Sequence, residues 1–140
     1  MLKRIAIVSI VVTLVVSGAA FAAAMSGTKV TLHSTKFGKV LASSSGRTLY
    51  FYTPETKTNI LCTGSCAQTW PPLMTSAKPK AGTGVKQSLL GTAKRSNGKL
   101  QVTYHGHPVY RYLGDKSAGA ANGEGFQGSW FVLKASGKQG

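Results

Sequence analysis

Acidic residues are the scarcest feature of this sequence. Its 140 residues include only three, Glu55, Asp115 and Glu124, against 17 Lys and Arg. Without Lys3 and Arg4, which belong to the leader described below, 15 basic residues remain and the net charge is +12. A positive charge of this size favours anionic partners, such as anionic lipid or wall polymer. The lysines are scattered, with no run interleaved with stacking aromatic residues, so nucleic acid is not expected as a partner.

Signals for catalysis and for cofactors are also lacking. No Ser lies in an elbow motif, and so few acids leave His without an orienting partner. Residues 123–128 spell G-x-G-x-x-G, but no strand–helix–strand unit surrounds them, so we interpret them as a glycine-rich loop. Glu55 and Asp115 could form a carboxylate pair, but only Glu124 could assist them. The sequence therefore predicts a protein without catalytic activity and without a cofactor.

The first 24 residues have the pattern of a secretory signal peptide. Lys3 and Arg4 precede the apolar run 5–16, and small residues end at Ala22-Ala23-Ala24. We expect this signal helix to be cleaved near Met25, which would release a soluble protein into the periplasm or the medium. The alternative is an uncleaved anchor, because residues 5–24 are barely long enough to span a bilayer.

The rest of the chain is an internal duplication. Tyr50-Phe51-Tyr52-Thr53-Pro54-Glu55 and Tyr110-Arg111-Tyr112-Leu113-Gly114-Asp115 share the pattern Tyr-x-Tyr-x-x-acid, sixty residues apart. The same shift aligns further pairs: Gly38 with Gly98, Lys39 with Lys99, Gly46 with Gly106, Trp70 with Trp130 and Leu73 with Leu133. We divide the chain into one β domain, 28–134, made of a first copy, 28–76, and a second copy, 88–134, followed by a flexible tail, 135–140.

Short β-branched or aromatic segments, cut by Gly, Ser, Asn and Pro, indicate an all-β fold. The expected strands are 30–36, 40–43, 49–53, 91–95, 100–104 and 109–113. No helical period follows the leader, and the linker 77–87 is expected to cross the surface. We predict about three to four short antiparallel strands in each copy. One copy has too little core to stand alone, so both should pack as one pseudo-twofold domain, a small sandwich or barrel.

The repeated motif is expected to build the core between the copies. In each strand the two Tyr side chains share one face, and the acid falls in the following turn, where it can accept backbone N–H bonds. We interpret the motif residues as structural, with a ligand-facing role as the alternative: Tyr50, Tyr52, Glu55, Trp70, Tyr110, Tyr112, Asp115 and Trp130.

Only two cysteines are present, Cys62 and Cys66. In an exported chain their short spacing favours a disulfide, which would contribute about 2 kcal/mol for a loop of about five residues. The alternative is a copper or zinc site, for which the sequence offers Cys62, Cys66, His105 and His107, with His33 and Met74 as further donors. The His pair and the Cys pair lie in different copies, so no metal site is assigned.

These motifs resemble a family of bacterial secreted repeats of unknown function, predicted lipoproteins with a tandem Tyr-x-(Phe/Trp/Tyr)-x-x-Asp motif. The resemblance covers residues 28–134 and rests on four segments: 46–50, 62–73, 104–110 and 122–130. It implies an exported protein, without naming an activity. Two departures are Glu55 in place of Asp and the absence of a Cys for lipid attachment near the leader.

The sequence as a whole predicts an exported module that binds an anionic component of the cell envelope and has no catalytic activity. The alternative is an extracytoplasmic copper- or zinc-handling protein or a thiol redox protein. The oligomeric state is left open between a monomer and an oligomer.

Overall fold

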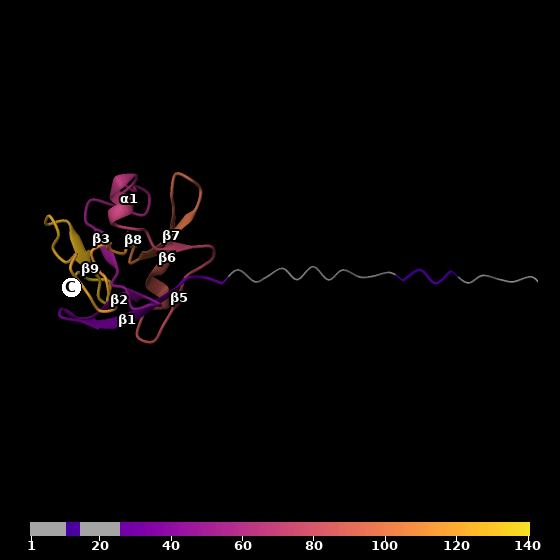
Figure 1. The fold of residues 1–140 in the computed structure, drawn as a ribbon, viewed down its shortest axis with the longest axis horizontal. Coiled ribbons are helices and arrows are strands. Elements are labelled where there is room, and N and C mark those ends of the chain that lie inside the picture. Colours follow the sequence, from indigo (N-terminus) through magenta and orange to yellow (C-terminus); the bar gives the residue numbers. More distant parts are fainter. Residues whose placement is uncertain (1–10, 15–25) are drawn as a thin grey trace, which may run out of the picture.

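The computed structural model describes residues 11–14 and 26–140. The predicted signal peptide, apart from residues 11–14, lies outside them. The described residues form mainly short strands (Figure 1). In chain order the elements are β1 (Lys29–Thr35), β2 (Gly38–Ser43), β3 (Tyr50–Tyr52), α1 (Ser65–Thr69), β4 (Met74–Thr75), β5 (Lys80–Ala81), a 3-10 turn (Gln87–Leu89), β6 (Leu90–Lys94), β7 (Leu100–Tyr104), β8 (His107–Pro108) and β9 (Trp130–Val132).

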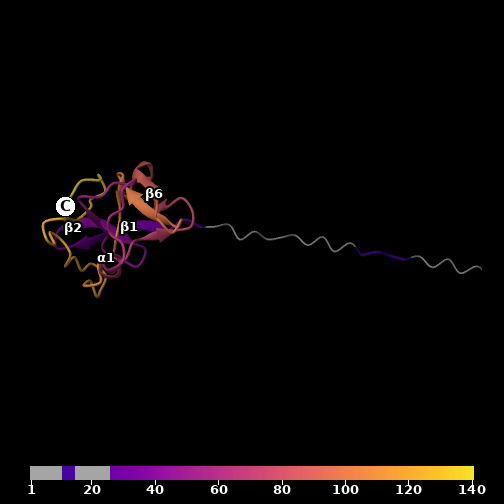
Figure 2. The same cartoon turned by 90° about the horizontal axis from the view of Figure 1, so that it is seen from above.

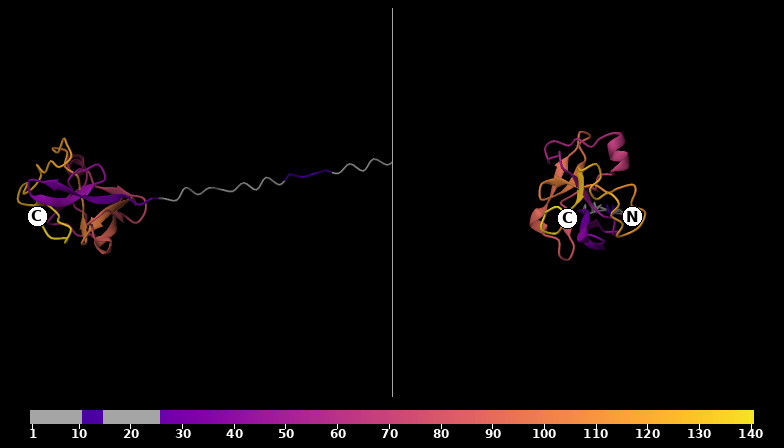
Figure 3. Two further views of the ribbon diagram at one scale, coloured as in Figure 1. Left: turned by 90° about the horizontal axis from the view of Figure 1, so that it is seen from below. Right: turned by 90° about the vertical axis from the view of Figure 1, so that its left-hand side faces the viewer.

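The first copy is built on the β1–β2 hairpin, which lies across one face of the domain in Figure 3. The strands pair antiparallel from Val30 opposite Ser43 to Thr35 opposite Gly38. Gly38 has φ 89°, a left-handed conformation that glycine adopts without strain. The linker adds a strand that the sequence did not predict, because β5 pairs in parallel with β1.

The second copy repeats this hairpin with β6 and β7, which pair from Leu90 opposite Tyr104 to Lys94 opposite Leu100. Strand β4 pairs with the other edge of β7. Seen from above, β6 lies to one side of β1 and β2, and α1 lies to the other (Figure 2). The turn after β6 has one residue more than the turn after β1, and the turn after β7 has one residue fewer than the turn after β2. Equivalent residues are therefore again sixty positions apart at Leu49 and Val109, whose N–H groups donate to Leu41 O and Val102 O.

A local twofold axis runs between Tyr50 and Tyr110. Their backbones exchange two hydrogen bonds, Tyr50 N–H to Tyr110 O at 2.8 Å and Tyr110 N–H to Tyr50 O at 2.9 Å. Two residues that exchange both backbone bonds in this way form a hydrogen-bonded pair of an antiparallel ladder. The copies are thus joined through the first tyrosine of each motif.

The expected strand 109–113 is not regular, and prolines explain why. In the first copy β3 pairs with β9, from Tyr50 opposite Val132 to Tyr52 opposite Trp130. The equivalent partner of residues 110–112 is Trp70-Pro71-Pro72, and proline has no N–H to donate to a ladder. Arg111 N–H still donates to Pro71 O at 2.8 Å, but Pro71 cannot return a bond, and the pairing is reduced to an isolated bridge between Pro72 and Tyr110.

Two further segments lie outside the sheets, and one of them differs from expectation. The sequence predicted no helix after the leader, but α1 forms one short turn that contains the second cysteine, Cys66, with its N-cap at Gly64, φ 56°. The C-terminal residues 135–140, for which the sequence predicts a flexible tail, turn back toward β9: Leu133 pairs with Gln139, and Gly140 N–H donates to Val132 O at 3.0 Å. Among the described residues, no helix is long and apolar enough to cross a membrane.

The core contains side chains from both copies and forms two clusters. The larger cluster contains Val30, Leu41, Leu49, Phe51, Leu73, Val85, Leu90, Val102, Tyr104, Val109 and Leu133. The smaller cluster lies on the local twofold axis and contains Val40, Tyr50, Cys62, Trp70, Tyr110, Ala121, Trp130 and Val132. Because each cluster draws on both copies, neither copy has a core of its own.

Candidate functional site

The tryptophans and second tyrosines of the two motifs form one column of four stacked rings. At its centre Trp70 and Trp130 stack with ring centroids 3.9 Å apart and planes 2° apart. Tyr52 stacks on the outer side of Trp130 at 4.7 Å, and Tyr112 on the outer side of Trp70 at 4.3 Å. Each copy contributes one Trp and one Tyr, so the local axis passes between the tryptophans.

The first tyrosines of the motifs meet this column edge-on. Tyr50 contacts Trp70 at 5.4 Å and 78°, and Tyr110 contacts Trp130 at 5.2 Å and 87°. Edge-to-face geometry is favourable because the positive ring edge faces the negative ring face. Tyr50 and Tyr110 are fully buried, and burial of each ring contributes on the order of 2 kcal/mol.

The two motif acids cross over between the copies. Tyr50 donates its hydroxyl to Asp115 Oδ2 at 2.6 Å, and Tyr110 donates to Glu55 Oε2 at 2.9 Å. Glu55 and Asp115 are both buried. Each carboxylate therefore binds the tyrosine of the other copy, a contact that spacing along the sequence does not reveal.

Each acid also closes the loop of its own copy. Glu55 Oε2 accepts the backbone N–H groups of Leu61 at 2.7 Å and Cys62 at 2.8 Å. Asp115 Oδ1 accepts the N–H of Asn122 at 2.8 Å. The carboxylates thus receive the backbone bonds expected of turn residues, in addition to the tyrosine hydroxyls.

The tyrosine hydroxyls remain protonated donors at neutral pH. Burial raises the pKa of Tyr50 well above its ordinary value, and the hydrogen bond to Asp115 adds to the rise. Burial also raises the pKa of Tyr110, and the negative charge of Glu55 adds to it. Both hydroxyls can therefore keep donating to the carboxylates across the physiological range.

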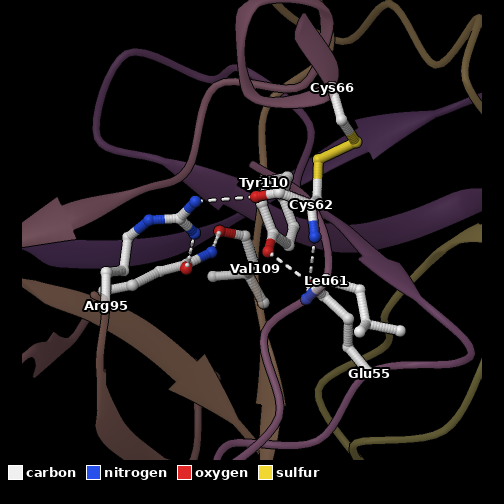
Figure 4. Close-up of a disulfide and its surroundings, with 8 residues drawn as sticks. Glu55, Leu61, Cys62, Cys66, Arg95, Val109 and Tyr110 are labelled. Atoms are coloured by element: carbon white, nitrogen blue, oxygen red, sulfur yellow. Dashed lines mark hydrogen bonds between the residues drawn. A yellow bond between two sulfur atoms is a disulfide. The ribbon is translucent and has the colours of Figure 1, made fainter. Parts of the chain in front are cut away.

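The predicted disulfide between Cys62 and Cys66 is confirmed. It lies directly beside the Glu55 bonds, because the N–H of Cys62 donates to that carboxylate (Figure 4). Arg95 of the second copy also donates to Cys62 O, at 2.7 Å. Within the described residues, Glu55 Oε1 is the buried side-chain oxygen without a hydrogen-bond partner.

The third acid serves the backbone as well. Glu124 lies in the glycine-rich loop 123–128 and accepts the N–H of Val132 at 2.6 Å. Burial raises its pKa, and the Val132 bond offsets part of that rise. This loop therefore holds β9 through a side chain.

The candidate metal ligands do not come together in the described part of the chain. The rings of His105 and His107 lie 6.3 Å apart, and burial lowers the pKa of His107, with His105 adding to the effect. Both sulfurs of the cysteine pair are in the disulfide. His33 lies in β1 and Met74 in β4. Among residues 11–14 and 26–140 no group of three or more His, Cys, Asp or Glu could hold a metal ion.

The sequence analysis missed a cationic cavity beside the second motif. Arg47, Arg111 and Lys116 line it together with Thr48, Pro71, Tyr112, Leu113 and Asp115, and its volume is about 300 Å³. The signal available in the sequence was a difference between the copies: the shift of sixty places Arg47 opposite His107 and Arg111 opposite Phe51.

Fold and site together define a duplicated all-β module in which two copies share one aromatic core. Comparison with family models identifies the kind of module. Residues 31–74 and 91–134 match the family described as a secreted repeat of unknown function, and the chain belongs to that family as an exported protein. The two matched segments begin sixty residues apart, as the duplication requires. No curated protein and no solved structure matches the chain.

Proposed function

We propose that this exported protein is a binding module for an anionic component of the cell envelope and that it acts without catalysis. It would work in the periplasm or outside the cell as a soluble domain. The observation that carries the proposal is the separation of charge between the interior and the surface of the domain.

The positive charges are at the surface. Residues 26–140 contain 15 Lys and Arg, of which 13 are exposed, and the other two, Arg47 and Arg95, are half-buried. A surface with this many cations attracts polyanions and phosphate-bearing membranes through its summed field.

The negative charges are directed inward. Glu55 and Asp115 are buried, and Glu124 is half-buried. Within the described part of the chain, the hydrogen bonds that these three carboxylates receive come from backbone N–H and tyrosine hydroxyl groups, and none comes from Lys or Arg. The surface cations are therefore left to interact with a partner.

The same arrangement argues against acid–base catalysis. A general acid or base must reach a proton of the substrate, whereas Glu55 and Asp115 hold the two halves of the domain together. The alternative, a copper- or zinc-handling protein or a thiol redox protein, would use Cys62 and Cys66 as thiols in at least one of its states. A thiol count and a metal assay on protein purified from the periplasm or medium separate the two functions, because two free thiols with stoichiometric copper would favour the alternative.

The proposal is tested by binding to vesicles at several salt concentrations. The protein should bind vesicles that contain an anionic phospholipid and should not bind purely zwitterionic vesicles. Binding should weaken steeply with salt, because the screening length falls from about 10 Å at 0.1 M to about 3 Å at 1 M. The same measurement on purified anionic wall polymer covers the other envelope partner. Absence of binding to both, or binding that does not depend on salt, would contradict the proposal.

A further inference from the structure

The cavity beside the second motif has cations from both copies on its walls. Arg47 comes from the turn that leads into β3 of the first copy, whereas Arg111 lies within the second motif and Lys116 directly follows it. Three positive side chains thus face one cavity of about 300 Å³. A volume of that size is at the lower end for small-molecule sites.

The one carboxylate in the cavity wall is already engaged. Asp115 accepts the Tyr50 hydroxyl on Oδ2 and the Asn122 N–H on Oδ1. The lining residues thus carry one negative charge against three positive charges. An incoming anion would meet a net positive wall rather than a set of closed ion pairs.

The cations are partly fixed in place before any ligand arrives. One guanidinium nitrogen of Arg47 donates to Asp115 O at 2.7 Å, and Arg47 is half-buried. Lys116 Nζ donates to Leu113 O at 2.9 Å. Arg47 keeps its remaining N–H groups for a ligand, and side chains held in this way lose less entropy when they bind.

The equivalent place in the first copy is filled. A shift of sixty relates Arg47, Arg111 and Pro71 of the cavity to His107, Phe51 and Phe131, which lie beside the first motif. Phe51 is buried, and its ring lies 4.5 Å from His107 and 6.3 Å from Phe131. Because the same fold can fill this place with rings, the open cationic cavity of the second copy is not imposed by the fold.

We infer that this cavity binds a phosphate group, held by Arg47, Arg111 and Lys116. The inference rests on the proposed function and names the site and the ligand chemistry for it. Three cations from two segments of the chain match a tetrahedral phosphate, which offers several oxygens, better than a planar carboxylate. Guanidinium groups are also well suited to bidentate bonds with phosphate. The volume leaves room for the glycerol or sugar to which an envelope phosphate is attached.

The test compares two double variants that lose the same charge. Arg111→Gln with Lys116→Gln removes two exposed cations of the cavity, and Lys39→Gln with Lys94→Gln removes two exposed cations from β2 and β6. In titrations with glycerol phosphate, the cavity variant should bind at least about tenfold more weakly than the native protein. The control variant should change by less than about twofold. Arg47→Gln, with its fold checked by thermal unfolding, should resemble the cavity variant.

The same proteins are then measured on vesicles that contain phosphatidylglycerol. If the cavity variant loses more binding than the control here too, the lipid headgroup is a ligand of the cavity. If the cavity variant and the control variant differ only in the glycerol phosphate titration, the cavity binds phosphate that is not part of a membrane. Equal loss in both variants, or no binding of glycerol phosphate by the native protein, would overturn the inference. In that case the native protein could still bind anionic vesicles. A cavity that does not bind phosphate is therefore distinguished from a protein that does not bind the envelope.

Discussion

The two copies use acids of different length for the same two kinds of contact. In the first copy the longer Glu55 reaches two N–H groups six and seven residues further on, Leu61 and Cys62, and all its bonds fall on one oxygen. In the second copy the shorter Asp115 divides its bonds, one oxygen for Asn122 and the other for Tyr50. The requirement common to both is a carboxylate that closes its own loop and accepts the hydroxyl of the other copy.

The copies also differ in how they use the space next to the motif. Phe51, His107 and Phe131 fill it beside the first motif, whereas Arg47, Arg111 and Pro71 line an open cavity beside the second motif. The aromatic column is nearly symmetrical by contrast. A duplicated domain can thus keep the contacts that hold the copies together and let one flank diverge.

The largest effect is expected for the motif acids. Glu55→Ala should lower the free energy of unfolding by about 3 kcal/mol and Asp115→Ala by about 1 to 3 kcal/mol, because buried donors lose their acceptor. Glu55→Gln should cost less than Asp115→Asn. A Gln amide can place its NH₂ at the Oε1 position, which has no partner, but both Asp115 oxygens already accept bonds.

Denaturant unfolding of these four variants measures the order. Near-native stability of both Ala variants would show that the acids do not hold the fold. An Asn variant of Asp115 more stable than the Gln variant of Glu55 would show that the division of bonds between oxygens has no energetic consequence.

The sequence predicted the elements whose signals are local. The hairpin strands, the duplication and the pairing of Cys62 with Cys66 follow from alternation, turn residues and spacing. The crossed bonds between tyrosines and acids join residues 55 and 65 positions apart, and no periodicity reports such a contact. The expected strand at 109–113 was wrong because its partner segment contains Pro71 and Pro72, so a feature of one copy altered the pairing of the other.

The same limit applies to the candidate site. The motif residues could be selected from the repeat alone, since both copies carry them. The cavity could not, because its cations are the residues in which the copies differ, Arg47 and Arg111 in particular. The residues repeated in both copies are those that the fold requires, whereas the residues that differ between the copies form the cavity.

A smaller effect is expected for the disulfide, which only the first copy has. Replacement of Cys62 and Cys66 together by Ser should lower the free energy of unfolding by about 2 kcal/mol, because the unfolded chain regains the freedom of the closed loop. In the Ser variant, Glu55→Ala should lower the free energy of unfolding by less than it does in the native protein, because the loop that Glu55 holds is then less ordered. The cost of Asp115→Ala should stay unchanged and serves as the control. An unchanged melting curve for the Ser variant would mean that the disulfide does not hold this loop.

The crossing of the two acids is the central claim, and double-mutant cycles test it most directly. One cycle combines Tyr50→Phe with Asp115→Ala, residues that bond across the copies. The other combines Tyr50→Phe with Glu55→Ala, residues of the same motif with no hydrogen bond between their side chains. Denaturant unfolding should give a coupling free energy of about 1 kcal/mol or more in the first cycle and less than about 0.5 kcal/mol in the second. Larger coupling within the motif than across the copies would contradict the account.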